Sequence, residues 1–211
     1  TSFGKFYNFS GILNADDIRL YYNKTKKTLY AFTERPIRVR NYSLGYSLIY
    51  DLTDFEVKLR YDSAQQDAVK QVFYAGNTQF VDDSNDNDAK AFRKRKKAYF
   101  GSPLHFFRAL YSNRLQKEGF QLFKRGFPVQ VKEVFGFRTV DDILYVSKRN
   151  GIRKLDVLFQ QKKQSFFELH TDEFIIDAYG NYAPTYDVLF GGEMGKQRIG
   201  SMLPIDYEVA Y

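Results

Sequence analysis

Five consecutive basic residues are the first feature of this sequence that could do chemistry: Arg93, Lys94, Arg95, Lys96 and Lys97. Lys and Arg side chains neutralise phosphate groups, and aromatic rings next to them can stack on nucleic-acid bases. Tyr99 and Phe100 follow the run closely enough to supply such rings. The pattern therefore raises the hypothesis of a polyanion-binding site, with nucleic acid as one form of the ligand.

The same basic run also has an ordinary structural explanation. Four aspartates come shortly before it: Asp82, Asp83, Asp86 and Asp88. The helix dipole favours acidic residues at the start of a helix and basic residues at its end. Residues 82–97 contain four Asp and six Lys or Arg, so they contribute only +2 to the net charge of +7. We therefore expect a solvated helix face rather than a nucleic-acid partner, with the polyanion hypothesis kept as an alternative.

The acidic stretch 82–88 raises a second hypothesis, calcium binding through oxygen ligands. An EF-hand loop requires glycine at position six and glutamate at position twelve. A loop starting at Asp82 has Arg93 at position twelve, and one starting at Asp83 has Asp88 at six and Lys94 at twelve. Neither register matches the EF-hand, and only a looser calcium site remains open.

The two histidines, His105 and His170, lie far apart in the sequence. They could form a metal site only with neighbouring carboxylates such as Glu168 or Asp172. His105 follows the start of an expected helix and lies next to its apolar stripe. A histidine at the edge of the core, bonded to a backbone group, is the more common outcome for such a position.

Two serine- and glycine-containing stretches resemble catalytic motifs only superficially. Residues 101–103 read Gly-Ser-Pro, which is a helix start rather than a nucleophile elbow. Residues 191–196 are rich in glycine, but Gln197 stands where a P-loop needs Ser or Thr. We expect a bulged strand end or a turn there. Carboxylate pairs for glycoside hydrolysis are recognised by separation in space, so the sequence leaves them open.

The composition requires a folded, well-packed chain to position these residues. The 211 residues include 21 Phe and 17 Tyr but no Trp and no Cys. So many large rings exclude intrinsic disorder, and the lack of cysteine excludes disulfide scaffolds, thiolate zinc sites and cysteine nucleophiles. No apolar run approaches the length of a membrane-spanning helix. The chain begins at Thr1 rather than Met, from which we expect an upstream segment to have been removed.

The first 80 residues have the patterns of β-strands. Residues 18–22 and 28–32 flank a polar connection, as in a hairpin, and residues 37–40 alternate strictly. The apolar alternation of residues 45–61 changes phase between Leu52 and Phe55, which predicts a bulge or bend. Residues 69–81 indicate one or two strands, broken near Gly76.

Two helices are expected in the middle of the chain, at about 87–100 and 103–118. Ser102 and Pro103 are a preferred cap and first residue for the second helix, and Gly119 followed by Phe120 is a typical stop. Strand patterns return in these ranges: 129–134, 143–146, 155–159, 166–169, 174–176 and 186–190. We therefore predict one α+β domain over residues 1–211, mainly antiparallel β and sandwich- or barrel-like, with the two helices in the middle.

Three stretches of the chain resemble a recurring pattern in one bacterial family: Thr28–Tyr46, Tyr99–Leu110 and Gly195–Glu208. The family comprises Gram-negative proteins described as carboxypeptidase-like regulatory domain-containing. In them a small transthyretin-like β-sandwich precedes a larger domain of unknown function. The stretches have the same order as in that second domain, and the β-sandwich is absent from this chain. The resemblance implies an exported protein of the outer membrane, cell surface or periplasm, and it supplies no catalytic residues.

We therefore expect a non-catalytic binding, adhesion or structural module of the cell envelope. The sequence leaves its partner unknown, with a glycan or a protein of the envelope or of a host as open candidates, and we expect no catalytic residue, metal or cofactor. The first alternative is a polyanion-binding protein that uses residues 93–97. The second is an envelope glycosidase or peptidase, which requires two carboxyl groups ~5–10 Å apart at the floor of a cleft.

Overall fold

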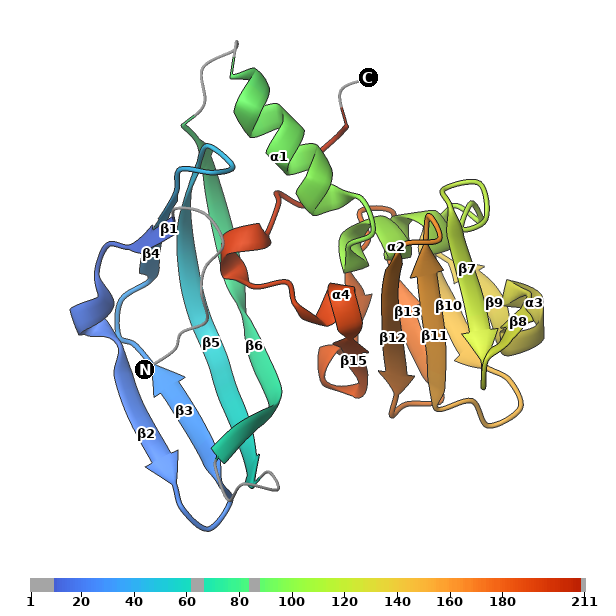
Figure 1. Cartoon of the computed structure of the whole chain (residues 1–211), viewed down its shortest axis with the longest axis horizontal. Coiled ribbons are helices and arrows are strands. Elements are labelled where there is room, and N and C mark those ends of the chain that lie inside the picture. Colours follow the sequence, from blue (N-terminus) through green and yellow to red (C-terminus); the bar gives the residue numbers. More distant parts are fainter. Residues whose placement is uncertain (1–9, 62–66, 84–87, 210–211) are drawn as a thin grey trace. The chain divides into compact units, whose positions relative to one another are not determined.

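Residues 10–61, 67–83 and 88–209 are described by a computed structural model of the chain (Figure 1). The fold is mainly antiparallel β, with three sheets and two substantial helices in the middle of the chain, as the sequence predicts. The elements pack into two units, residues 1–94 and 95–211. This division concerns packing and not independent folding, so the single domain over residues 1–211 stays a prediction.

The first unit contains one six-stranded sheet. Its strands are β1 (Ser10–Ile12), β2 (Arg19–Asn23), β3 (Thr28–Phe32), β4 (Ile37–Asn41), β5 (Tyr46–Tyr61) and β6 (Asp67–Asp82), with a 3-10 turn at Ala15–Asp17. The order is β1-β4-β5-β3-β2, and β6 pairs along the whole of β5. The expected β2–β3 hairpin is present, and β4 alternates between buried and exposed residues as predicted.

The predicted irregularity in the long strand β5 is confirmed, and it explains a prediction that is wrong. The register of β5 against β6 shifts between Leu52 and Asp54. Gly76 pairs with Leu52 at this shift, inside a continuous β6, so the expected break near Gly76 does not occur. A Cβ atom on Gly76 would come within 2.2 Å of the Asp51 carbonyl oxygen. Glycine therefore permits close approach of two strands here, and it does not interrupt the strand.

The two helices begin where the sequence predicts. Helix α1 (Ala89–Tyr99) is capped by Asp88, whose Oδ1 accepts a hydrogen bond of 2.9 Å from the Ala91 amide. Helix α2 (Pro103–Tyr111) is capped by Ser102, whose Oγ accepts a hydrogen bond of 3.0 Å from the His105 amide. Both contacts satisfy amides that have no partner within their helix.

Helix α2 ends at Tyr111, earlier than the predicted position near residue 118. Asn113 takes a left-handed conformation, and the Arg114 amide bonds the Ala109 carbonyl, which together form a Schellman stop. A separate turn follows and closes in the same way at Gly119, where the Phe120 amide bonds the Leu115 carbonyl. Gly119–Phe120 is therefore a stop signal, as predicted, but it closes this turn and not the helix.

The second unit contains two further antiparallel sheets. Its strands are β7 (Phe120–Lys124), β8 (Phe127–Val129), β9 (Phe135–Val140), β10 (Ile143–Lys148), β11 (Lys154–Phe159), β12 (Lys163–Leu169), β13 (Glu173–Ile176), β14 (Tyr182–Ala183) and β15 (Val188–Gly191). One sheet has the order β15-β12-β11-β7-β8, and the other has the order β14-β13-β10-β9. Short helical turns occur at α3 (Val131–Val134), Thr185–Asp187, α4 (Gly192–Gly195) and Ile199–Ser201.

Two of the predicted strands differ from the structure. Most of 129–134 forms α3 instead, and the Glu133 carboxylate accepts a bond of 2.9 Å from the Gln130 amide as in a capping box. The strand predicted at 186–190 starts only at Val188, after the 3-10 turn. Both misreadings come from apolar residues that local hydrogen bonds place in turns.

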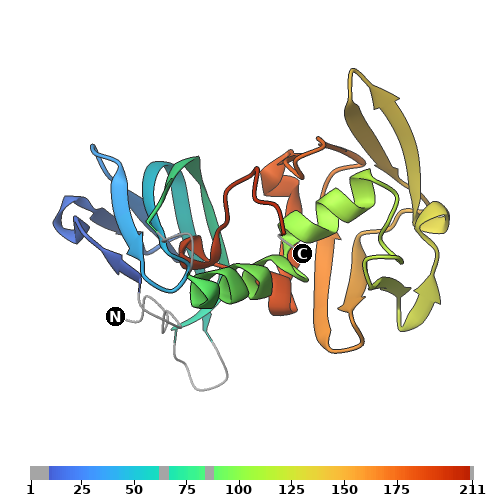
Figure 2. The ribbon, with the colours of Figure 1, turned by 90° about the horizontal axis from the view of Figure 1, so that it is seen from above.

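The two sheets of the second unit lie face to face, with α2 at one end of the sandwich (Figures 1 and 2). Phe135 of β9 contacts Phe167 of β12 across the sheets, with ring centroids 6.1 Å apart. From α2, Phe106 reaches Phe167 and Phe107 reaches Phe174 of β13. The helix therefore closes the core by contacting both sheets. No helix in the described residues is long and apolar enough to cross a membrane.

Candidate functional site

The outer face of the five-stranded sheet carries an unusual set of side chains. Along β11 and β12, buried positions alternate with more exposed ones, and the buried residues face the second sheet. The outward positions of β7, β11 and β12 are occupied by these residues: Gln121, Phe123, Lys154, Asp156, Leu158, Gln164, Phe166 and Glu168. Phe123, Leu158 and Phe166 among them are half-buried, so this face combines partly accessible apolar groups with polar ones and is a candidate binding surface.

An open hollow of about 560 Å³ lies over this face. It is lined by Phe123, Gly126, Asp156, Val157, Leu158, Gln164, Ser165, Phe166 and Gly192. Its volume falls in the range of ligand sites, which are about 300–1,000 Å³. The lining comes from three strands and from two glycine-containing turns at their ends.

Strand register brings the key residues of the hollow into one row. Phe123 pairs with Asp156, Asp156 pairs with Phe166, and Phe166 pairs with Gly191. A Cβ atom on Gly191 would come within 2.1 Å of the Phe166 ring, so this ring occupies the space that a side chain would fill. Packing of an aromatic ring over a cross-strand glycine fixes the position of the ring on the sheet.

Two polar side chains of the hollow, Asp156 and Gln164, have no partner within the described residues. Neither the Asp156 carboxylate nor the Gln164 amide makes a hydrogen bond or ion pair there. Lys154 stands beside them, with its Nζ 3.8 Å from the centre of the Phe166 ring and 3.9 Å from Glu168 Oε1. The Asp156 carboxylate, between Phe123 and Phe166, and the Gln164 amide, opposite Leu158, are therefore available to a ligand.

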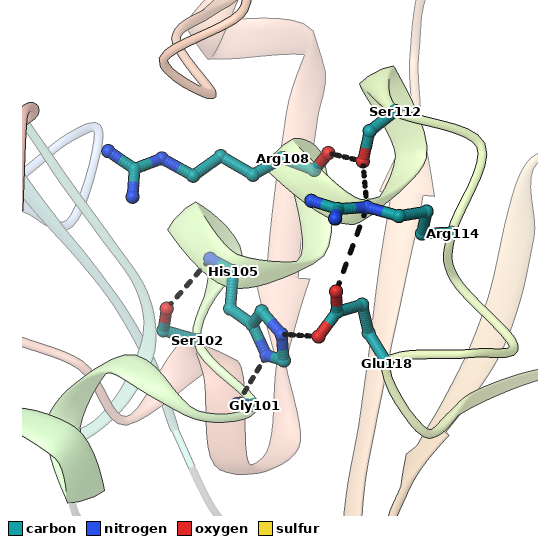
Figure 3. A network of polar contacts seen from close by, with 7 residues as sticks. All are labelled: Gly101, Ser102, His105, Arg108, Ser112, Arg114 and Glu118. Carbon is teal, nitrogen blue, oxygen red and sulfur yellow. Dashed lines mark hydrogen bonds and ion pairs between the residues drawn. The ribbon is translucent and has the colours of Figure 1, made fainter. Parts of the chain in front are cut away.

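His105 belongs to a network of polar contacts that includes Gly101, Ser102 and Glu118 (Figure 3). The ring is 2% exposed, and Nδ1 accepts a hydrogen bond of 3.2 Å from the Gly101 amide. Nε2 lies 3.4 Å from Glu118 Oε2, and Glu118 also contacts Arg114 Nε at 3.7 Å. The Gly101 contact requires an unprotonated Nδ1, so Nε2 carries the proton and donates to Glu118.

These contacts make His105 a structural residue. Burial lowers its pKa, the hydrogen bond and charge of Glu118 oppose this shift, and the positive charges of Lys163 and Arg108 add to it. Rings of Tyr99, Phe100, Phe120 and Phe159 surround the imidazole. Because both ring nitrogens face protein groups, neither is left to act as a base or a metal ligand. The core-edge histidine bonded to a backbone group was the outcome expected from the sequence.

Arg108, on the same helix, holds the C-terminal part of the second unit. Its Nε donates to the Tyr179 carbonyl at 2.9 Å, and its two terminal nitrogens donate to the carbonyls of Tyr207 and Ile205. The Tyr207 ring lies 5.6 Å from the Tyr99 ring. Burial raises the pKa of Tyr207, while the charge of Arg95 opposes this shift. We assign this cluster to anchoring of the chain.

The other histidine does not assemble a metal site. His170 Nε2 lies 3.8 Å from Glu168 Oε2, and Asp172 is paired with Lys148 at 2.9 Å. Within the described residues, no group of three or more His, Asp or Glu side chains could hold a metal ion. His170 and Glu168 therefore lie close together, but the two histidines and two carboxylates singled out in the sequence form no metal-holding group within the described residues.

The basic residues 93–97 lie on α1, but they do not form one continuous surface. Arg95 is 3% exposed, and Lys94 Nζ donates to Ser43 Oγ at 2.8 Å. Only Arg93 and Lys97 are classed as exposed. A polyanion site, the alternative hypothesis for this run, would thus have fewer available cations than the sequence pattern indicates.

The two loop hypotheses have different outcomes. Residues 84–87 of the acidic stretch, including Asp86, lie outside the described residues, so a looser calcium site there stays a prediction. The glycine-rich stretch 191–196 is the end of β15 followed by the single turn α4, as expected for a strand end. The Met194 amide there bonds Ser165 Oγ at 3.1 Å.

Neither the hollow on the outer sheet face nor a second hollow of the same unit is lined by a pair of carboxylates. Asp156 is the only acid among the residues that line the hollow on the outer sheet face. A second hollow of about 260 Å³, between the start of α2 and the C-terminal residues 201–205, is lined by no acid. The geometry expected of a glycosidase is therefore absent from these two places.

Four residues of the hollow carry no sequence motif that marks them as a site: Phe123, Asp156, Gln164 and Phe166. The available signal was the pair Phe166–Phe167 within a strand, because adjacent strand residues face opposite sides and one Phe must then point away from the core. The row across β7, β11 and β12 depends on strand register, which the sequence does not contain.

Comparisons of this chain with protein-family models, curated proteins and solved structures found no match. The fold and the site therefore define a class only: a β-rich α+β protein with an open, partly aromatic hollow on one sheet.

Proposed function

We propose that this chain is a non-catalytic binding module of a bacterial cell envelope, and that its ligand occupies the hollow on the outer face of the five-stranded sheet. The observation that carries the proposal is the row Phe123–Asp156–Phe166, in which an unpaired carboxylate lies between two outward aromatic residues. Such a row offers contact area and polar partners to a ligand.

The chemistry of the other candidate groups supports binding rather than turnover. A general base needs an accessible nitrogen or oxygen within reach of a substrate proton, and His105 has both nitrogens engaged with protein groups. Glycoside hydrolysis needs two carboxyl groups, and one lines this hollow. The envelope location rests on the sequence resemblance of the stretches 28–46, 99–110 and 195–208.

Protease treatment of intact native cells, followed by detection of the chain with an antibody, tests the location. We expect loss of the signal from intact cells, or loss after the outer membrane is opened, because an exported protein lies outside the inner membrane. Protection until full lysis would contradict the envelope assignment and make residues 93–97 the leading site.

Substrate turnover by the purified chain tests the non-catalytic part. We expect none from the wild-type protein against peptide and glycoside substrates. A turnover that the substitution Asp156→Asn abolishes would refute the assignment as a binding module, since it would make the hollow an active site.

A further inference from the structure

We propose that the hollow on the outer sheet face binds a neutral oligosaccharide. This inference rests on the proposed function for the position of the site and adds the chemical class of the ligand. The apolar surfaces, the polar groups, the charge and the shape of the hollow each favour this ligand.

The apolar surfaces suit the flat, C–H-bearing face of a sugar ring. Phe123 and Phe166 lie on β7 and β12, with β11 between them, so their backbones are about 10 Å apart at the usual strand spacing. Leu158 lies between the two outer strands and lines the hollow. A ligand that contacts both rings at once must extend across three strands, which favours more than one sugar unit.

The polar groups match hydroxyls better than they match a purely cationic ligand. The Asp156 carboxylate can only accept hydrogen bonds, whereas the Gln164 amide both donates and accepts. Sugar hydroxyls also donate and accept, so they can satisfy both side chains. An ammonium or guanidinium group has donors alone and would leave the Gln164 NH₂ group without a partner.

The charge around the hollow favours a neutral ligand. The Lys154 ammonium lies 3.8 Å from the centre of the Phe166 ring. It therefore occupies the position in which a cationic ligand would make a cation–π interaction with that ring. A ligand anion would meet the Asp156 carboxylate, which is the only charged side chain that lines the hollow. A cationic ligand thus finds the position over the Phe166 ring occupied by Lys154, and an anionic ligand is repelled by Asp156.

The shape of the hollow favours a chain that passes over the surface. It lies on an exposed sheet face rather than in an enclosed cavity, and the turn at Gly126 and the first residue of α4, Gly192, border it. Glycine has no side chain, so these two borders stay low, and the ends of a longer saccharide can extend beyond them.

A titration of the full chain, labelled with ¹⁵N and followed by two-dimensional NMR, tests this inference. Maltotetraose, cellotetraose and chitotetraose are the probes. We expect at least one of them to shift amide signals within residues 121–126, 154–158 and 164–166. The substitutions Phe123→Ala and Asp156→Asn should each weaken that binding about tenfold or more, because each removes a ring contact or a charged acceptor.

Matched control variants separate the hollow from general surface effects. Phe127→Ala removes a ring that is 75% exposed on the same hairpin as Phe123 but does not line the hollow. Asp141→Asn removes an exposed carboxylate in the β9–β10 turn, where asparagine tolerates the left-handed backbone. We expect both controls to bind like the wild type and all four variants to give folded spectra.

Three outcomes would overturn the saccharide assignment: no shift with any of the three probes, shifts that the controls alter as much as the hollow variants do, or tighter binding of tetramethylammonium at the same amides. The location test is independent of these outcomes. A chain that lies on the cell surface but shows no amide shifts at the hollow with any of the three saccharides would refute this inference alone. A chain protected until lysis that still binds maltotetraose in the hollow would refute the envelope assignment alone.

Discussion

Replacing His105 with phenylalanine tests the assignment of this residue to the structural framework. The substitution His105→Phe keeps an aromatic ring among Tyr99, Phe100, Phe120 and Phe159 but removes the acceptor for the Gly101 amide and the donor to Glu118. An unsatisfied buried amide costs about 1–3 kcal/mol. We expect the free energy of unfolding at pH 7.5 to fall by that amount.

The pH dependence of the difference has a definite sign. Burial lowers the pKa of His105 from 6.5, so the unfolded chain binds the proton more readily than the folded chain. The stability that depends on the neutral imidazole is therefore fully present above about pH 6.5 and is lost as the pH falls through the folded-state pKa. Phenylalanine does not titrate, so the gap between the wild type and the variant should narrow from pH 7.5 to pH 5.

Urea unfolding followed by far-ultraviolet circular dichroism measures both effects, since the chain has no Trp to report by fluorescence. His170→Gln is the control, because His170 is the other histidine and its side chain is 55% exposed. We expect this control to leave the pH dependence unchanged. A gap that widens toward pH 5, or an equal pH effect in the control, would contradict the assignment of His105.

Two further substitutions test the packing inferred from the structure. Gly76→Ala should lower the free energy of unfolding by about 1–3 kcal/mol because its Cβ meets the Asp51 carbonyl, whereas Gly11→Ala, in open space, should change it by less than about 0.5 kcal/mol in thermal or urea unfolding. Arg108→Met should lower the free energy of unfolding by about 2–3 kcal/mol and speed proteolysis near Ile205, because the Arg108 guanidinium bonds three backbone carbonyls. Arg125→Met, on an exposed turn, is the control. Equal effects of Gly76→Ala and Gly11→Ala, or of the two arginine variants, would contradict these assignments.

Local patterns predicted those parts of the fold that local interactions determine. The alternation of β4, the irregularity after Leu52, and the cap at Ser102 each follow from residues close together in the sequence. The end of α2 did not follow, because asparagine at position 113 adopts a left-handed conformation less often than glycine does, and Gly119 offered a stronger stop signal. The sequence pattern therefore predicted a left-handed stop for α2, but placed it at Gly119 instead of Asn113.

The candidate site was not predictable in the same way. Asp156 pairs with Phe123 and with Phe166, which are 33 and 10 residues away in the sequence, and only strand register brings the three into a row. The basic run 93–97 is visible as a pattern in the sequence because its members are adjacent in the chain. Adjacency on a helix nevertheless distributes side chains around the axis, so Arg95 is buried while Arg93 is exposed.

Strand register also explains why an open sheet can hold a binding site without an enclosed pocket. Across β12, β11 and β7 every second residue faces outward, so the register that aligns Phe167, Leu155 and Val157 in the core also aligns Phe166 and Asp156 on the surface. A shift of one residue in either pairing would move the outward row inward. The core contacts of Phe167 with Phe106 and Phe135 therefore fix the geometry of the hollow on the opposite face. A ligand that binds there uses a surface that folding has already positioned.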